Sequence, residues 1–192
     1  MIIFGIDPGL AHLGVAVADL NPLRFRYTCV VSTEKSDRKR KIRSVDDSTA
    51  RLQELVRQLT TLMEVYNPAA FACEAPSYPR DAGTAAKIGM SWGAVVALAE
   101  ACSLPVLVYT PQECKKALCG RISATKDEVQ RKLEELYPGI GALWPRGARG
   151  GTALIEHAAD ACSAIHACKD TNEIRLLTST PGAAKEKTAC ER

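Results

Sequence analysis

The chain has 192 residues, of which 46% are hydrophobic and 24% are charged, and its formal net charge is +3. This composition is typical of one globular domain that is large enough to bury a core. No apolar run approaches the ~20 residues of a membrane helix, and no basic segment precedes the apolar start at Met1, so we expect neither a membrane span nor a signal peptide.

Hydrophobic periodicity predicts three strands, a helix, a strand, a helix, a strand and then further helices. The strands are expected at residues 2–7, about 12–19, about 25–32, 69–74 and 106–109. The helices are expected at residues 46–66, about 81–103, about 111–119, 125–136 and about 151–168. This order predicts an α/β fold with a mixed five-stranded sheet and helices on both faces, in which functional sites lie near strand ends.

Two of the predicted helices differ in kind. Leucine and other apolar residues recur at helical spacing between Leu52 and Tyr66, which predicts an amphipathic helix that packs on the sheet. The helix at about 81–103 is instead rich in alanine and contains Gly83, Gly89 and Gly93. Such small residues permit close backbone approach, either to a sheet or to a second subunit.

The remaining segments are expected to lack regular structure. Two prolines make residues 75–80 a loop, and residues 137–151 are rich in glycine and proline, which predicts a mobile loop. Residues 171–192 lack apolar periodicity and are expected to form a disordered tail. The sequence therefore predicts one domain over residues 1–170, followed by this tail.

The cysteines favour a reducing compartment. Of the eight cysteines, none forms a C-x-x-C pair, and Cys114 and Cys119 have no matching pair of ligands nearby. Most of the others lie in apolar stretches, where cysteine behaves as a small hydrophobic residue. We therefore expect free thiols in a cytoplasmic protein, without disulfides or a zinc site.

Acidic residues stand at apolar edges in three separate segments. Asp7 ends the first strand, Glu74 ends the fourth, and Asp160 lies on the last helix with His157 one turn earlier. A carboxylate at the end of a buried strand is costly unless it is paired or binds a cation. If the helix face docks against both strand ends, three carboxylates and an imidazole converge, a ligand set that suits Mg²⁺ or Mn²⁺.

Each of these residues also has an ordinary structural interpretation. Asp7 before Pro-Gly is a common turn residue, Glu74 fits a loop charge, and a single histidine is more often packed or exposed than bound to metal. The combination of strand-Asp, strand-Glu and helix-His-x-x-Asp is much less common by chance. Two divalent ions in such a site activate water for phosphodiester hydrolysis without a protein nucleophile. Glu156 is a further candidate for an accessory group, although we rather expect its side chain to be exposed to solvent.

The segment from Lys35 to Arg43 is strongly basic. It carries six basic residues and one acidic residue. Such a run is compatible with a solvated surface loop and with an arm that contacts phosphates. The predicted cation site favours the second interpretation and a nucleic-acid substrate.

Five stretches resemble, in the same order, motifs of the RuvC family of Holliday-junction resolvases. They are GIDPGLAHLGVAVAD, FACEAP, TAAKIGMSWGAVVALAEA, TPQECKKALCGRISATKDEVQ and HAADACSAI. The resemblance covers about residues 1–168, and the motifs together are specific. The first motif alone occurs throughout the wider ribonuclease-H-like superfamily.

The resemblance implies a ribonuclease-H-like fold and a homodimer that nicks two opposing strands of a four-way DNA junction, with two Mg²⁺ or Mn²⁺ ions per site and no small-molecule cofactor. Asp7, Glu74, His157 and Asp160 match the metal-binding set of the family. Lys115 and Lys126 match basic positions near the scissile phosphate, where a lysine is a point charge that stabilises negative charge.

The resemblance and the basic segment together predict a DNA-contacting set. Its members are Lys35, Arg38, Lys39, Arg40, Lys41, Arg43, Tyr78 and Arg80. Tyr78 is the only aromatic residue where the family carries a wedge that opens the junction. The long basic segment and the extra tail favour a divergent, phage-type member that acts on branched DNA.

Two other functions fit parts of the same sequence. Asp7, Gly9 and Gly14 also match the first phosphate motif of sugar kinases and actin, although such ATP-binding phosphotransferases need two domains and a second copy of the motif. A non-catalytic DNA-binding module would keep the basic segment. It gains nothing from carboxylates where phosphates must approach.

Overall fold

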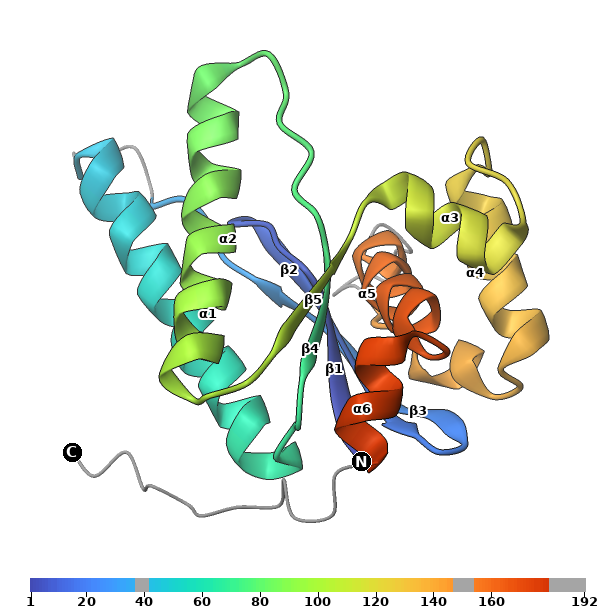
Figure 1. The fold of residues 1–192 in the computed structure, drawn as a ribbon. Helices are drawn as coiled ribbons and strands as arrows, with labels where there is room; N and C mark the ends of the chain where they lie inside the picture. The colour runs from blue at the N-terminus through green and yellow to red at the C-terminus, as the bar shows by residue number, and fades with distance from the viewer. Residues whose placement is uncertain (37–41, 147–153, 180–192) are drawn as a thin grey trace.

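The computed structural model describes residues 1–36, 42–146 and 154–179. Its centre is a five-stranded sheet in the order β3-β2-β1-β4-β5 (Figure 1). The strands are β1 (Ile2–Asp7), β2 (His12–Leu20), β3 (Leu23–Ser32), β4 (Phe71–Glu74) and β5 (Val106–Tyr109). The predicted mixed sheet is confirmed.

The pairing of the strands brings two predicted site residues to one edge. β1, β2 and β3 form an antiparallel meander, whereas β4 runs parallel to β1 and β5 runs parallel to β4. In the β1–β4 register Ile6 lies opposite Cys73. The next residues, Asp7 and Glu74, therefore end neighbouring strands at the same edge of the sheet.

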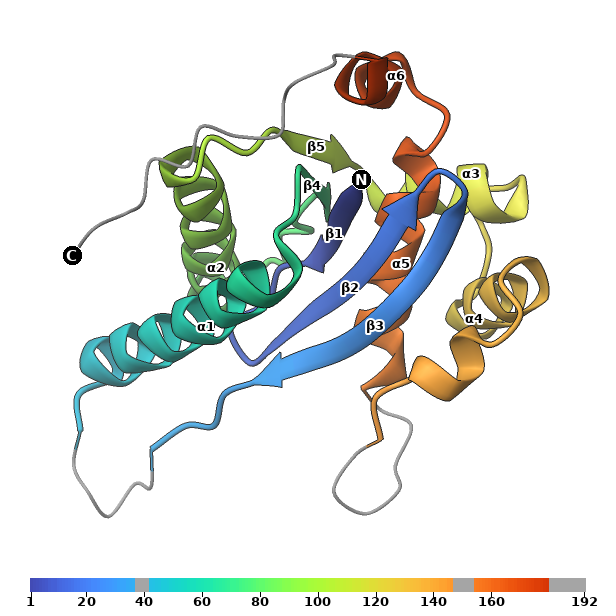
Figure 2. The same ribbon diagram turned by 90° about the horizontal axis from the view of Figure 1, so that it is seen from below.

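Helices cover both faces of the sheet, as predicted (Figure 2). The helices are α1 (Ser44–Tyr66), α2 (Ala82–Ala101), α3 (Pro111–Cys119), α4 (Lys126–Leu136), α5 (Ile155–Cys168) and α6 (Asn172–Ser179), with a 3-10 turn, η2 (Ile140–Leu143). α1 and α2 lie on one face, and α5 lies on the other, with α3 and α4 packed outside it. The predicted capping box at Thr125 and Glu128 begins α4.

The two faces of the sheet carry side chains of different size. On the face toward α1 and α2, the buried strand residues are mostly large; they are Phe4, Ile6, Leu13, Val15, Val17, Val31, Phe71 and Cys73. On the α5 face, near the edge that carries Asp7, they are small; they are Gly5, Gly14, Ala16 and Ala72. Larger residues, Ile3, Leu20 and Phe25, occur on this face toward the opposite edge.

Three expectations for loops and the tail are wrong within the described residues. Residues 172–179 form α6, in which Ile174 is buried, and residues 180–192 lie outside the described part. The segment after Tyr137 contains η2, and Trp144 is buried with its Nε1 donating to Glu134 Oε1 at 2.7 Å. α5 begins at Ile155 instead of near 151; residues 147–153 are not described.

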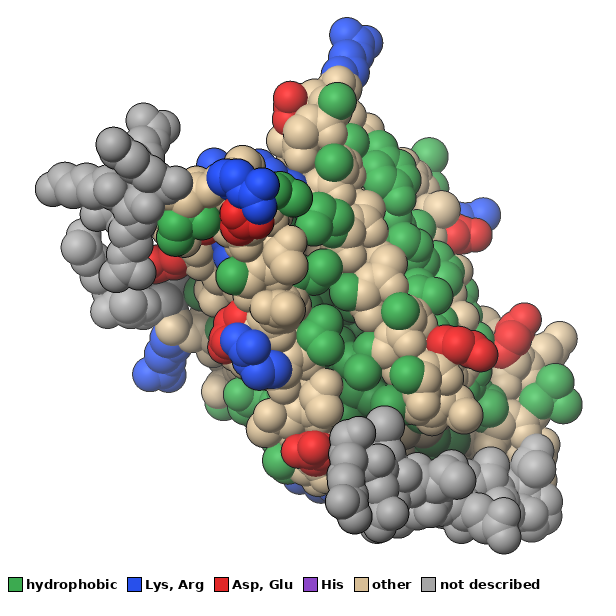
Figure 3. Space-filling view, turned by 90° about the vertical axis from the view of Figure 1, so that its left-hand side faces the viewer, with side chains coloured by type: hydrophobic (Ala, Val, Ile, Leu, Met, Phe, Trp, Pro, Cys, Tyr) green, Lys and Arg blue, Asp and Glu red, His purple; other side chains and the backbone are tan. Residues whose placement is uncertain are grey.

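The surface of α2 also differs from expectation. By length and composition α2 is apolar enough to cross a membrane, and only 17% of its most apolar window is buried inside the protein. The prediction that no segment reaches this hydropathy is therefore wrong. Figure 3 shows hydrophobic side chains gathered on the side of the molecule that α1 and α2 form. Added Cβ atoms at Gly89 and Gly93 would meet no atom within 4 Å, so these glycines face away from the sheet.

Candidate active site

The alternation of side chains along the strands places both strand-end acids on the α5 face. In β1, Asp7 follows Ile3 and Gly5 at two-residue intervals, and in β4, Glu74 follows Ala70 and Ala72. Residues two apart in a strand project to the same face. Both carboxylates therefore project toward α5 at the edge where β1 and β4 end.

Two glycines let α5 approach these carboxylates. A Cβ at Gly14 would lie 2.1 Å from the carbonyl oxygen of His157, and a Cβ at Gly5 would lie 2.1 Å from that of Ala161. No side chain fits at either position, so the backbone of α5 rests almost directly on the sheet. As a result, His157 Nδ1 lies 2.7 Å from Asp7 Oδ2, although the two residues are 150 positions apart.

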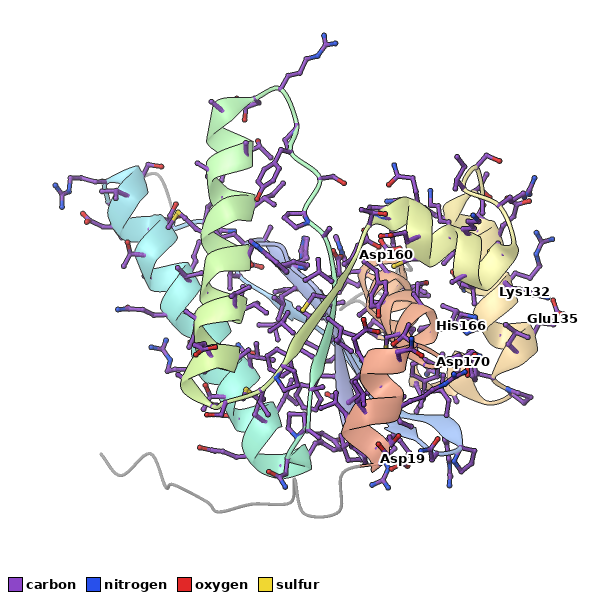
Figure 4. All side chains as sticks on the ribbon, in the orientation of Figure 1. Asp19, Lys132, Glu135, Asp160, His166 and Asp170 are labelled. Atoms are coloured by element: carbon purple, nitrogen blue, oxygen red, sulfur yellow. The ribbon has the colours of Figure 1, made fainter. Side chains whose placement is uncertain are left out.

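Asp160 lies on the same part of α5. Figure 4 labels it near the end of the sheet toward which β1 and β4 run, whereas His166 and Asp170 lie further along the chain toward the other end. Asp160 and Glu74 line two adjoining cavities of about 530 and 230 Å³, and Asp7 and His157 line the larger one. The four residues predicted to form one site are therefore gathered around the hollow that these two cavities form together.

Burial and the closeness of other carboxylates raise the pKa values of two acids in this hollow. Burial, followed by repulsion from Asp160 and Asp7, raises the pKa of Glu74 to about 8. Burial, followed by repulsion from Asp7, raises the pKa of Asp160 to about 6. Lys115 and Lys126 oppose both shifts without cancelling them. Further positive charge in the hollow would stabilise both carboxylates.

The donor set fits a hard divalent cation in its chemistry. Carboxylate oxygens with one imidazole nitrogen suit Mg²⁺ or Mn²⁺, and a bound cation would favour the ionised form of both buried acids. As the side chains stand, no three His, Cys, Asp or Glu residues of the described part meet closely enough to hold an ion. The assignment of this set as metal ligands thus stays a prediction.

The two predicted lysines lie on the α3 and α4 side of the hollow. Lys115 lines the smaller cavity, and Lys126 lines both. Lys126 forms an ion pair with Glu156 of α5, which lines the larger cavity while its side chain stays 40% exposed. Lys115 is half-buried, whereas the neighbouring Lys116 is exposed and does not line either cavity.

The predicted DNA-contacting residues are less uniformly placed. Lys35 lines the larger cavity. Arg43 occupies the N-cap position of α1, and its side chain forms two hydrogen bonds with the side chain of Asp46, at 2.6 and 2.8 Å. Tyr78 and Arg80 are exposed in the loop between β4 and α2, but they do not line the cavity. Arg38, Lys39, Arg40 and Lys41 lie outside the described residues.

Sequence reasoning missed three residues with basic side chains that line the larger cavity, His12, Arg51 and Lys87. Arg51 is buried, donating from Nε to Thr33 Oγ1 at 2.9 Å and from Nη2 to the Thr33 carbonyl at 3.2 Å. It holds the segment after β3 to α1. A signal was available, because Arg51 lies four residues before Leu55 in the buried stripe of α1.

Cysteines near the hollow are poor nucleophiles. Cys114 lines the smaller cavity, but burial, followed by the nearby Glu74 and Asp160, raises the pKa of its thiol. Burial also raises the pKa of Cys73 to about 12. These thiols therefore stay protonated at neutral pH. The seven described cysteines are free, in agreement with the prediction of reduced thiols.

Comparison with known proteins finds relatives that share one family description. Residues 3–138 match the family model of crossover junction endodeoxyribonuclease RuvC, a segment that contains Asp7 and Glu74 and ends before α5. Crossover junction endodeoxyribonuclease RuvC of Pseudothermotoga lettingae is 33% identical over 156 residues, covering 80% of this chain and 91% of the relative. That of Natranaerobius thermophilus is 28% identical over 137 residues, covering 71% and 80%.

Solved structures agree with these relatives. Thermus thermophilus RuvC, in complex with a Holliday junction substrate, superposes with a TM-score of 0.68 at 27% identity, covering 87% of this chain and 92% of that one. The yeast mitochondrial Holliday junction resolvase Ydc2 superposes with a TM-score of 0.56 at 13% identity, covering 87% and 79%, and supports the fold alone.

Proposed function

Because the chain belongs to the RuvC family of crossover junction endodeoxyribonucleases, we propose that it resolves four-way DNA junctions by metal-dependent hydrolysis of two opposing phosphodiester bonds. The observation that carries this proposal is the hollow at the sheet edge, which Asp7, Glu74, His157 and Asp160 surround. Four-way junctions are the proposed substrate, and the same assay tests other branched DNA as a second one.

The proposed metal ligands are Asp7, Glu74, Asp160 and His157. Nucleases of this family depend on divalent metal ions, and two Mg²⁺ or Mn²⁺ ions bound here would activate water and stabilise the leaving oxygen. The protein's part is to hold the carboxylates on rigid strand ends and on a helix that the sheet supports. The pair between His157 Nδ1 and Asp7 Oδ2 fixes the orientation of both side chains.

The proposed role of the lysines is electrostatic. Lys115 and Lys126 lie beside Glu74 and Asp160, as their effects on the pKa of both acids indicate. A lysine at this distance from the carboxylates attracts the phosphate and stabilises the charge that develops on it. Because Lys126 already pairs with Glu156, DNA binding would exchange this partner for a phosphate.

The proposed DNA path runs over the basic side of the larger cavity. Lys35 and Lys87 line it beside Arg51. The basic segment that begins at Lys35 and ends at Arg43 would extend this contact along the backbone. Tyr78 and Arg80 stand exposed in the loop that follows Glu74, where they are available to bases or phosphates of the bound strand.

We infer a homodimer that forms through α2. Two nicks in opposing strands require two sites, and the proposed ligands of one chain surround one hollow. The outward face of α2 is apolar and built of small residues, with Gly89 and Gly93 open to close approach by another helix. Gly93→Arg is expected to give a folded monomer, because its side chain points away from the core; light scattering measures the mass.

Membership in this family also decides between the alternatives raised by the sequence. A phosphotransferase would bind ATP tightly, and a non-catalytic module would bind junctions without cutting them. Isothermal titration with ATP is expected to show no tight binding.

Reduced cysteines fit a cytoplasmic location, and cell fractionation tests it.

The decisive experiment is a cleavage assay on labelled four-way, Y-shaped and linear DNA with Mg²⁺, with Mn²⁺ or with EDTA. Wild type is expected to nick the four-way junction symmetrically with either metal and to leave all substrates intact in EDTA. Asp7→Asn is expected to abolish cleavage and to retain junction binding in a gel-shift assay. Normal cutting by this variant with Mg²⁺ would show that the site assignment is wrong.

A further inference from the structure

His12 shares a strand face with the carboxylates of the hollow. It is the first residue of β2, and along this strand His12, Gly14, Ala16 and Ala18 alternate onto the α5 face. Asp7 and Glu74 lie on the same face of neighbouring strands. The tight turn from Asp7 to His12 fixes this position, because a Cβ at Gly9 would lie 2.4 Å from the carbonyl oxygen of His12.

The contacts of His12 leave one ring nitrogen for the cavity. Its Nδ1 lies 3.0 Å from Ser32 Oγ on the paired strand β3. The ring centroid lies 5.4 Å from that of His157, and His12 lines the larger cavity. Within the described residues Nε2 has no hydrogen-bond partner. His12 thus presents an anchored ring with a free nitrogen beside the Asp7–His157 pair.

Neither the core nor the carboxylate cluster explains this arrangement. His12 is half-buried and belongs to neither hydrophobic cluster. Lys115 and Lys126 lie on the α3 and α4 side, near Glu74 and Asp160. His12 instead lies beside His157, which pairs with Asp7. A phosphate entering between two groups of carboxylates needs hydrogen-bond donors on both sides.

We propose that His12 is a substrate-contacting residue that donates a hydrogen bond from Nε2 to a non-bridging oxygen of the phosphate bound beside Asp7. This inference rests on the proposed nuclease function. It requires the tautomer in which Nδ1 accepts from the Ser32 hydroxyl and Nε2 carries the proton. Ser32 is then a positioning residue for the ring.

A matched pair of variants tests the position of the donor. His12→Gln places an amide nitrogen near the position of Nε2, whereas His12→Asn places its amide near Nδ1, at similar polarity. In single-turnover cleavage of a four-way junction at saturating Mg²⁺, His12→Asn is expected to be about 10- to 100-fold slower than wild type, and His12→Gln is expected to recover most of the rate. Equal rates for His12→Asn and wild type would overturn the inference.

A second measurement separates phosphate contact from metal binding. Titration of the DNA-free protein with Mn²⁺ is expected to give the same affinity for His12→Asn and wild type, because the proposal gives His12 no role as a ligand. A tenfold loss of Mn²⁺ affinity would make His12 a metal ligand and overturn the proposal. Ser32→Ala is expected to slow cleavage by about 3- to 10-fold through the freed ring.

The result for wild type distinguishes a failure of the inference about His12 from a failure of the proposed nuclease function. If wild type nicks the junction and His12→Asn does so equally well, only the inference about His12 fails. If wild type cuts none of the branched substrates with either metal, the proposed function fails and this inference fails with it. Thermal unfolding of each variant is expected to match that of wild type, which shows that the rates report on the site.

Discussion

The two faces of the sheet are built on different principles. The face toward α1 and α2 carries Phe4, Val15 and Phe71, and its helices pack on large side chains. The face toward α5 carries glycine at positions 5 and 14, and the backbone of α5 rests on the sheet. On the first face these large side chains pack against the helices, and their burial stabilises the fold. The second brings polar groups from distant segments within hydrogen-bond distance.

This difference shows that one face of a small sheet can pack side chain against side chain while the other packs backbone against backbone. A core of large side chains tolerates adjustment, because neighbouring side chains repack around a change. A backbone-to-backbone contact has no such freedom. The hollow that holds Asp7 and His157 therefore depends on the absence of two side chains as much as on the presence of the acids.

Gly14→Ala is expected to have the largest effect. The new Cβ would meet the carbonyl oxygen of His157 at 2.1 Å, so α5 must move away from Asp7. A displacement of about 1 Å at a reacting centre costs about 100-fold in rate, and overpacking costs about 1–3 kcal/mol of stability or more. Cleavage kinetics and urea unfolding measure both. A variant with wild-type activity would mean that the close approach of α5 is not needed for the site.

Lys115→Ala tests whether the helices outside α5 extend the site. Lys115 faces Glu74 and Asp160, and its loss removes a charge that lowers the pKa of both acids. Cleavage is expected to fall by about 10- to 100-fold. Lys116→Ala is the matched control on the same helix, since Lys116 is exposed and lines neither cavity. Equal losses for the two variants would point to general attraction of DNA instead.

Val15→Ala tests the opposite face. Val15 is fully buried on the side of α1 and α2, next in sequence to Gly14. Its truncation is expected to lower the free energy of unfolding by about 1–3 kcal/mol through lost burial and a cavity. The cleavage rate at a temperature where the variant is folded should stay near that of wild type. A rate loss as large as that of Gly14→Ala would abolish the distinction between the faces.

Glu74→Gln is expected to increase stability slightly, in contrast to the loss of stability expected for Val15→Ala. The pKa of Glu74 is raised from its ordinary 4.5 to about 8, so the metal-free fold favours the protonated acid. Wild type should therefore lose stability as the pH rises from about 4.5 through about 8, because the carboxyl must ionise in the hollow. At pH 9 in EDTA the variant is expected to be more stable than wild type by about 1–3 kcal/mol.

The same variant carries its own control. Well below pH 4.5 the acid is protonated in both folded and unfolded wild type, so the difference in stability should shrink. Cleavage by Glu74→Gln should be lost at every pH, since a proposed ligand is gone. A variant that is less stable than wild type at pH 9 would show that the carboxylate is not strained in the fold.

The amino-acid sequence alone was enough for most of the elements and for proposing a candidate site. Strand alternation, the apolar stripe of α1 and the capping box at Thr125 are local patterns, and each appears in the structure where the sequence predicts it. Acids at the ends of two strands and on one helix also mark a candidate site, because they are costly there without a partner. The family resemblance rested on the same motifs.

Only the tertiary structure decided how closely these elements meet. The contact between Asp7 and His157 depends on Gly5 and Gly14 together with α5, and these segments are far apart in the chain. The distance between a helix and a sheet depends on the sizes of the side chains on both surfaces. The hydrophobic periodicity of a single segment does not contain this information. For the same reason the burial of Arg51, the docking of α6 and the place of His12 beside His157 emerged only when the chain was folded.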